Sequence, residues 1–304
     1  MPYNREGEKE KDKRRAASHA GPDGRDACVR EAGMSESWPV ALAIGGSDSG
    51  GGAGIQADLK TFFSLGVHGA CAITSVTSQN TLGVVSRYDL PAEAVVSQVE
   101  AVLDDFEVAA AKTGMLATSS VVSAVAALLR RRGIRNLVVD PVTFSSGGYP
   151  LLEAGGAVVM AEALLPIAAV FTPNLREASL FLGREVKDEA GMKAAARELR
   201  KLGPTCVVVK GGHLGGRQAV DIFYDGKDLV ELSSPRIKTE DDHGTGCVFS
   251  AAIAARLARG ESPLGAVRGA KEDITAALLR SLRLGAGRGP VNPSAGGVGG
   301  AVSP

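Results

Sequence analysis

The sequence contains few aromatic residues and has no excess charge of either sign. Phe, Trp and Tyr make up 4% of its 304 residues, and 34 Lys and Arg balance 34 Asp and Glu, so the formal net charge is zero. Nucleic-acid-binding proteins usually show a basic excess or aromatic side chains placed among basic ones. We therefore expect no nucleic-acid partner.

Long apolar runs are also missing. No stretch of the chain reaches the roughly 18 uninterrupted apolar residues that a membrane-spanning helix needs. The charged N-terminal segment is not followed by the apolar core of a secretory signal. We therefore expect no membrane partner and a cytoplasmic location.

Cysteine is scarce, whereas glycine is abundant. The four cysteines, Cys28, Cys71, Cys206 and Cys247, form no Cys-x-x-Cys pair, so neither a zinc site nor a disulfide framework is indicated. Glycine accounts for 39 of the 304 residues, well above the usual share of about 7%. Many turns of the backbone must therefore pass close to another group.

Both ends of the chain differ from its centre. Residues 1–38 contain the mixed-charge run REGEKEKDKRR without apolar periodicity and predict a disordered extension, with translation from Met34 as an alternative. Residues 293–304 are rich in small residues and predict a flexible tail. Residues 39–292 are expected to form one domain, because about 250 residues fit a single core.

Within this domain, short β-branched runs alternate with longer Ala- and Leu-rich segments of helical period. The alternation is typical of βαβ units and predicts an α/β fold with a central, mainly parallel sheet. Asp225 and Gly226 separate two further strand segments and predict a hairpin with a type I′ turn. The expected strands are 40–44, 70–77, 109–112, 136–139, 169–172, 206–210, 219–224 and 229–235, and the expected helices are 55–65, 92–104, 119–132, 156–165, 189–202, 248–258 and 263–282.

A glycine-rich loop from Gly45 to Gly54 follows the first expected strand and leads directly into a helix. Ligands of open α/β sheets bind beyond the carboxyl ends of the strands, and a helix start offers free backbone N–H groups for anionic atoms. A dinucleotide-binding fingerprint is not supported, because the second strand region contains no acidic residue, and a Walker P-loop lacks its Gly-Lys-Ser/Thr ending. The loop by itself indicates only a ligand near the first strand.

The segment from Asp242 to Cys247 places Gly244 and Gly246 at the start of another helix. Backbone N–H groups in such a position form an anion hole suited to a phosphoryl group in transfer. A thiol at a helix N-terminus also ionises more easily than usual. Cys247 is therefore a candidate catalytic base, although a small residue packed at a helix start gives the same pattern.

Polar residues follow three other expected strands. Asn174 and Glu177 are suited to order Mg²⁺ through water, while Glu177 is equally suited to cap the next helix. Lys210 is a candidate phosphate ligand. The amide of Gln79 matches the hydrogen-bonding edge of a heterocycle but also suits a turn.

Together these segments resemble the hydroxymethylpyrimidine/phosphomethylpyrimidine kinases of thiamin biosynthesis, members of the ribokinase-like superfamily. The resemblance extends from about Val40 to Asn292 and rests on the ordered blocks GSDSGGGAGIQADLKTF, SQNT, KTGML, VVDPV, PLL, TPNLREA, VKGGH, HGTGC and GRGPVN. It implies a three-layer α/β/α sandwich, a homodimer and the use of ATP and Mg²⁺. The implied reaction phosphorylates 4-amino-5-hydroxymethyl-2-methylpyrimidine to its monophosphate and then to the diphosphate.

The resemblance also implies roles for individual residues. The catalytic base would be Cys247, and the anion hole would be formed by Gly244, Thr245 and Gly246. The pyrimidine pocket would be lined by Gln79, Gly46, Asp58, Met115 and Val142, with a solvated helix charge as the alternative for Asp58. The nucleotide phosphates would be bound by Lys210, Asn174 and Glu177, and Mg²⁺ would be held, through water, by Glu177 and Asp140.

The segment from Thr143 to Tyr149 departs from the family pattern. A basic and an acidic side chain are absent from this loop, which is expected to cover the active site and to bear on the second phosphorylation. Two other functions stay open: a pyridoxal or pyridoxine kinase of the same superfamily, and a pyrimidine-binding protein without catalysis. The second is disfavoured by the presence of Lys210, Glu177 and Cys247.

Overall fold

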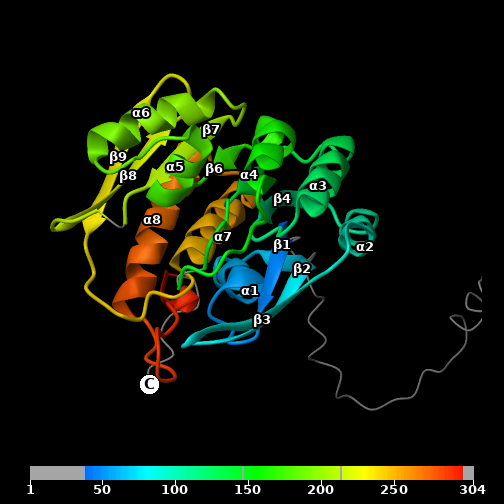
Figure 1. Ribbon diagram of the computed structural model, residues 1–304, viewed down its shortest axis with the longest axis horizontal. Coiled ribbons are helices and arrows are strands. Elements are labelled where there is room, and N and C mark those ends of the chain that lie inside the picture. The colour runs from blue at the N-terminus through cyan, green and yellow to red at the C-terminus, as the bar shows by residue number, and fades with distance from the viewer. Residues whose placement is uncertain (1–37, 146, 213, 297–304) are drawn as a thin grey trace, which may run out of the picture. The chain divides into compact units, whose positions relative to one another are not determined.

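The computed structural model describes residues 38–145, 147–212 and 214–296. Apart from Trp38, the expected disordered extension lies outside the described residues, as do residues 297–304 of the expected tail. The described part of the chain contains a nine-stranded sheet between two layers of helices (Figure 1).

The sheet has the strand order β3-β2-β1-β4-β5-β6-β7-β8-β9. Its parallel part consists of β2 (His68–Asn80), β1 (Val40–Asp48), β4 (Val108–Thr113), β5 (Leu137–Val139), β6 (Val170–Phe171) and β7 (Cys206–Lys210). One edge carries the antiparallel strand β3 (Gly83–Asp89), and the other carries the antiparallel strands β8 (Gln218–Tyr224) and β9 (Leu229–Pro235). The carboxyl ends of the parallel strands therefore meet on one side of the sheet.

Alternation of side chains along the strands divides the core between two faces. In β1, Ala41 and Ala43 belong to one face and Leu42 and Ile44 to the other, and all are buried. Both faces are apolar because helices cover both of them. The first face packs against α1 (Gly54–Ser64), α7 (Thr245–Ala258) and α8 (Pro263–Leu279), and the second against α2 (Ala92–Leu103), α3 (Ser119–Arg131), α4 (Gly156–Val159), α5 (Leu175–Leu182) and α6 (Glu189–Arg200). The three-layer α/β/α sandwich with a mainly parallel sheet is thereby confirmed.

The hairpin of β8 and β9 has nearly the expected strands, but its turn is of another type. Tyr224 pairs with Leu229, so that four residues, 225–228, form the loop. The carboxylate of Asp225 accepts hydrogen bonds from the backbone N–H groups of Lys227 at 2.8 Å and Asp228 at 2.7 Å. The prediction of a type I′ turn is wrong, because that turn needs two consecutive residues with positive φ and only Gly226 has one in this loop. The hairpin itself is confirmed.

Two further elements differ from the sequence-based expectation. The edge strand β3 is additional to the expected strands. The segment expected as one helix from 156 to 165 changes from α4 to a π turn at Met160–Leu164 and a 3-10 turn at Leu165–Ile167. Pro166 has no backbone N–H to continue the helix, which explains why regular geometry ends there.

The described residues after α8 return to the body of the domain. Pro293–Gly296 form a 3-10 turn, and the Ser64 hydroxyl donates a hydrogen bond to the Pro293 carbonyl at 3.0 Å. A search of the described residues for a helix of the length and apolar character needed to cross a bilayer found none.

Candidate active site

A cavity of about 670 Å³ opens at the carboxyl ends of the parallel strands. Its walls come from β1, β2, β4 and β7, from the loops after β5 and β6, and from the start of α7. All residues to which the sequence resemblance assigns a role line this one cavity: Gly46, Asp58, Gln79, Met115, Asp140, Val142, Asn174, Glu177, Lys210, Gly244, Thr245, Gly246 and Cys247. The fold thus brings together side chains that are up to about 200 positions apart in the sequence.

The start of α7 has the geometry expected of an anion hole. Gly244 is the N-cap residue with φ of 84°, and a Cβ atom there would overlap the carbonyl oxygen of Gly52. Only glycine fits this position without strain. Helix geometry leaves the backbone N–H groups of Gly246 and Cys247 without intrahelical acceptors, and both residues line the cavity.

The thiol of Cys247 does not ionise easily in this environment. Its pKa is raised to about 11: burial is the largest cause, and the charges of Asp58 and Asp140 add to the rise, whereas the charge of Lys112 and the N–H of Gly54 oppose it. The expectation of a readily ionised thiol is therefore wrong for the protein without ligands. Desolvation, which is invisible in a sequence motif, is the largest cause of this rise in the pKa.

The expected substrate residue Asp58 forms a buried ion pair with Lys112. Both carboxylate oxygens accept hydrogen bonds from the Lys112 ammonium, at 2.9 and 2.8 Å, and both side chains are 1% exposed. Burial raises the pKa of Asp58 to about 6, while Lys112 opposes that rise. The alternative of a solvated helix charge is wrong, because Asp58 is fully buried in the cavity wall.

Lys112 is a cavity residue to which the sequence analysis assigned no role. Burial lowers the pKa of Lys112, but the charges of Asp58, Cys247 and Asp140 raise it by more, so the ammonium stays charged. The signal for this residue was a single charged side chain at the end of the apolar strand β4, where ligand-facing residues occur in such sheets.

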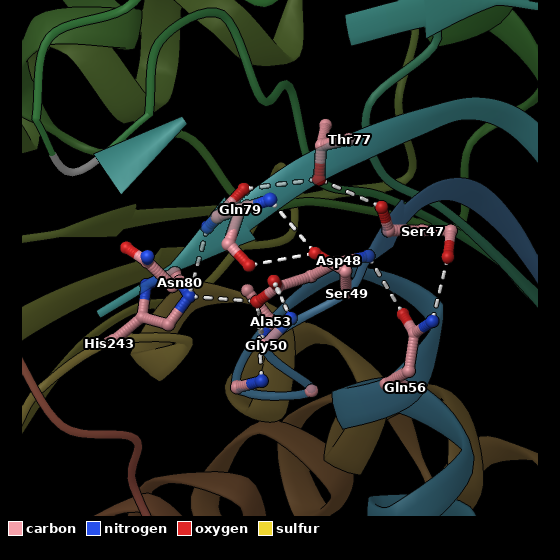
Figure 2. A network of polar contacts seen from close by, with 12 residues as sticks. Ser47, Asp48, Ser49, Gly50, Ala53, Gln56, Thr77, Gln79, Asn80 and His243 are labelled. Atoms are coloured by element: carbon pink, nitrogen blue, oxygen red, sulfur yellow. Dashed lines mark hydrogen bonds and ion pairs between the residues drawn. The ribbon is translucent and has the colours of Figure 1, made fainter. Parts of the chain in front are cut away.

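The glycine-rich loop before α1 differs from the expected anion site. The carboxylate of Asp48 accepts hydrogen bonds from the backbone N–H groups of Gly50, Gly52 and Ala53, at 2.8, 3.2 and 2.9 Å. These N–H groups therefore are not free for an anionic ligand. The loop is organised around Asp48, which in turn contacts His243 at 2.9 Å (Figure 2).

A second charged cluster contains Lys210, Asp140 and Glu177. The Lys210 ammonium donates to Asp140 at 2.8 Å, and Ser250 donates to the same carboxylate at 3.1 Å. Asn174 and Glu177 form a complete capping box at α5, so the helix-capping role predicted for Glu177 is confirmed. Burial raises the pKa of Glu177 to about 7, with Lys210 opposing and Asp140 adding to the rise.

Part of the cavity lining is apolar. Met115 and Leu151 are buried in a small cluster with the partly buried Val142. A Cβ atom at Gly46 would lie 3.0 Å from the sulfur of Met115, so glycine leaves space beside this wall. Gln79, next to the last residue of β2, lines the same cavity and contacts His243 at 3.2 Å. An apolar wall with one amide suits a flat heterocycle.

Part of the loop that departs from the family pattern, Thr143 to Ser145, lines the cavity. Phe144 lines the cavity, forms a β-bridge with Pro150 and stacks under the Arg176 guanidinium, 3.5 Å from the ring centroid. The Arg87 guanidinium donates to the Pro150 carbonyl at 3.0 Å. Arg176 thus brings a basic group to the side of the loop that lacks its own basic residue.

This fold and site define a class of protein, the ribokinase-like small-molecule kinases, and comparison with known proteins gives the family. A sequence profile described as Phosphomethylpyrimidine kinase matches residues 48–292. A hydroxymethylpyrimidine/phosphomethylpyrimidine kinase of Rhizobium meliloti is 50% identical over 256 residues, covering 83% of this chain and 96% of its own. The chain therefore belongs to the phosphomethylpyrimidine kinase family, and the sequence-based identification is confirmed.

Solved structures agree with this assignment of the fold. The Bacillus subtilis pyridoxal kinase in complex with ADP has a TM-score of 0.80 at 40% identity, with coverage of 85% of this chain and 98% of its own. A phosphomethylpyrimidine kinase from Clostridium difficile has a TM-score of 0.70 at 38% identity, with coverage of 79% and 99%. The protein is thus a kinase whose solved neighbours include both pyrimidine and pyridoxal enzymes.

Proposed function

We propose that this kinase transfers the γ-phosphoryl group of ATP to the hydroxymethyl oxygen of 4-amino-5-hydroxymethyl-2-methylpyrimidine, and then a second phosphoryl group to the monophosphate, in thiamin biosynthesis. The proposal is supported by the family match and by relatives named for both steps. The observation that carries it is one cavity whose lining combines Gln79 and the apolar Met115 and Val142 with the start of α7 and Lys210.

Binding of the pyrimidine ring in this mechanism depends on the placement of Gln79, Met115 and Val142. Gln79 offers an amide oxygen and an amide nitrogen to the amino group and ring nitrogen of the pyrimidine, while Met115 and Val142 contact its apolar face. This placement directs the hydroxymethyl group toward Cys247. Holding the acceptor oxygen in line with the γ-phosphorus supplies much of the rate in phosphoryl transfer.

The proton of the hydroxymethyl group goes to the Cys247 sulfur, which must first be a thiolate to accept it. The Lys112 charge and the Gly54 N–H favour that thiolate against the effect of burial. The oxygen then attacks the γ-phosphorus, and the bond to the β-phosphate oxygen breaks with ADP as the leaving group. The N–H groups at the start of α7 and the Lys210 ammonium stabilise the charge that develops.

The residues present fit Mg²⁺ bound through water. Among the described residues, no three His, Cys, Asp or Glu side chains gather closely enough to hold a metal ion directly. Asp140 and Glu177, however, are buried near one another with Lys210, and the Asp140 charge raises the pKa of Glu177. Such an excess of buried carboxylate suits a hydrated divalent cation, which would neutralise phosphate charge when bound with ATP.

A pyridoxal kinase is the second candidate, because a pyridoxal kinase is among the structural neighbours at 40% identity. The two activities differ in the heterocycle that the cavity accepts and share the phosphoryl-transfer end. A cytoplasmic location and a homodimer, both expected from the sequence analysis, stay predictions.

The proposed function is tested by following ADP release with MgATP while offering the aminopyrimidine alcohol and pyridoxal separately, with the products identified by mass. Diphosphate formed from the pyrimidine is the expected result. Arrest at the monophosphate would assign the second step to side chains absent from the Thr143 to Tyr149 loop. A preference for pyridoxal would move the protein to the second candidate, and no turnover with either alcohol would contradict the proposal.

A further inference from the structure

The side chain of Arg176 lines the cavity and has no hydrogen-bond or ion-pair partner among the described residues. The other lysines and arginines of the cavity lining are bound to acceptors: Lys112 to Asp58, Lys210 to Asp140, Lys271 to Asp221, Arg288 to Asp242, and Arg236 to the carbonyls of Gly212, Gly216 and Gln218. The N–H groups of the Arg176 guanidinium are therefore available to an anionic ligand.

The ring of Phe144 supports this guanidinium, whose central carbon lies 3.5 Å from the ring centroid. A guanidinium stacked on a ring keeps its N–H donors at its edges, where a ligand can reach them. Phe144 forms a β-bridge with Pro150, and the neighbouring Thr143 carbonyl accepts a hydrogen bond from Leu151 N–H at 2.9 Å. The support is thus itself fixed, which lowers the entropy lost when a ligand binds.

Arg176 is connected to both parts of the cavity lining that the proposed function uses. Phe144, on which it stacks, is two residues from Val142, and both line the cavity. Asn174, two residues before Arg176, forms a β-bridge with Lys210. Two residues of chain span at most roughly 7 Å. An anion bound by Arg176 is therefore close both to the apolar part of the lining and to the proposed phosphate ligand Lys210.

The second phosphorylation brings more negative charge into this cavity than the first. The alcohol is neutral, whereas a phosphate monoester carries a charge of about −1.5 to −2 at pH 7. It must approach the γ-phosphoryl group of ATP, which is also anionic, so a cation beside the acceptor gains importance once the acceptor is charged. Lys112 and Lys210 each contact a carboxylate already, at 2.8 Å.

We propose that Arg176, stacked on Phe144, binds the phosphate of the substrate monophosphate and thereby serves the second phosphoryl transfer more than the first. The inference rests on the proposed function, because it concerns the second acceptor of the same site. In this transfer, an oxygen of the monophosphate forms a bond to the γ-phosphorus of ATP. The bond from that phosphorus to the oxygen shared with the β-phosphate breaks, and ADP leaves with the electron pair. The dianionic acceptor has no proton to lose.

A guanidinium suits this task better than an ammonium does. Its paired N–H groups match two oxygens of one phosphate, which leaves the third terminal oxygen for the attack. A lysine at position 176 would keep the charge but donate from a single point and stack less well.

The test measures kcat/KM for the aminopyrimidine alcohol and for its monophosphate, each from initial rates of its own product at saturating MgATP. In the full-length protein, Arg176→Gln is expected to lower kcat/KM for the monophosphate by about 10- to 100-fold, mainly through its KM. The ratio of the monophosphate value to the alcohol value is expected to fall about tenfold or more. Arg176→Lys is expected to recover part of this loss. Calorimetry without ATP is expected to show the same selective weakening of monophosphate binding.

Arg197→Gln is the matched control. Arg197 is also exposed and lies over an aromatic ring, 5.8 Å from the centroid of Tyr224, but it is not part of the cavity lining. Its substitution is expected to change neither value. If Arg176→Gln fails to fold, as judged by circular dichroism, Phe144→Leu decides, because it removes the supporting ring and is expected to lower the same ratio.

Two results would overturn the inference: an unchanged ratio in a folded Arg176→Gln protein, or a wild-type protein that stops at the monophosphate. Equal losses with both acceptors count as an unchanged ratio and would place Arg176 at the ATP phosphates instead. A wild type that turns over neither the alcohol nor the monophosphate would overturn the proposed function, and this inference with it.

Discussion

The chemistry proposed for Cys247 depends on a thiol that its surroundings keep protonated. Burial dominates the rise of its pKa to about 11, and Lys112 is the charge that opposes it most strongly. At neutral pH only a small fraction of the unliganded protein then holds the thiolate. The rate is therefore expected to depend measurably on the ionisation of this one side chain.

The pH profile of kcat/KM for the pyrimidine alcohol is expected to rise with a slope near one between pH 7 and pH 9. This parameter follows the ionisation of the free enzyme, in which the thiolate fraction grows about tenfold per pH unit below the pKa. Cys247→Ala is expected to remove the slope and to lower turnover on the order of 10²–10⁴-fold, the usual effect of a positioned base. A flat profile in the wild type would show that the thiolate is not the required form.

Glu177 is expected to lower the stability of the fold at neutral pH. Its pKa in the folded protein, about 7, lies above the ordinary value of 4.5 for a glutamate side chain, so its ionisation opposes folding. The effect is absent near pH 4, grows between these two pKa values and is complete above the higher one.

Glu177→Gln is therefore expected to raise the melting temperature by a few degrees at pH 8, on the order of 1–3 kcal/mol, and by much less near pH 4. Glutamine retains the capping box, so the change removes the buried charge without removing the helix cap. Turnover is expected to fall in the same variant. The exposed Glu272→Gln is the control, and an equal gain at both pH values would contradict the argument.

At the scale of elements, the sequence patterns predicted where strands and helices lie better than they predicted which groups surround a given side chain. The strand from Cys206 to Lys210 has the bounds expected from its β-branched run, because a buried parallel strand is a local pattern of this kind. The pairing of Asp58 with Lys112 could not be predicted, because it joins α1 to the end of β4 across the cavity wall. Desolvation of Cys247 likewise depends on elements that are distant in the chain.

The start of α7, which forms the proposed anion hole, keeps its position only if its N-cap residue has no side chain. Gly244→Ala is expected to abolish most turnover, because the new methyl group would overlap the Gly52 carbonyl and displace the start of α7. Gly260, just after the end of the same helix, has nearly the same φ, 85° against 84°, but a Cβ atom added there would meet no other atom within 4 Å.

Gly260→Ala is therefore the matched control for Gly244→Ala. It is expected to cost about 1–2 kcal/mol of stability through backbone strain alone, with turnover preserved. Steady-state kinetics and thermal unfolding of both variants separate the two effects. Equal losses of turnover in both would show that strain, and not the contact with Gly52, controls the site.

For the whole molecule, the domain that carries the chemistry is expected to function without the first 33 residues. The family match begins at residue 48, and the residues lining the cavity lie between Gly45 and Arg288. A protein starting at Met34 is therefore expected to keep the kcat, both KM values and the melting temperature of the full chain. A fall in any of these would assign a function to the N-terminal segment.

The order of site residues along the chain separates two tasks. Those proposed to contact the ring all precede residue 143: Gly46, Asp58, Gln79, Met115 and Val142. Those proposed to act on the transferring phosphate follow it, from Asn174 to Cys247, with Asp140 as the exception. Substitutions at the ring-contacting residues can thus alter which alcohol is accepted while the donor end stays intact, provided that Lys112 and Asp140 are kept. A library confined to residues 45–142, with Lys112 and Asp140 unchanged, is consequently the economical route to kinases for new heterocyclic alcohols built on this scaffold.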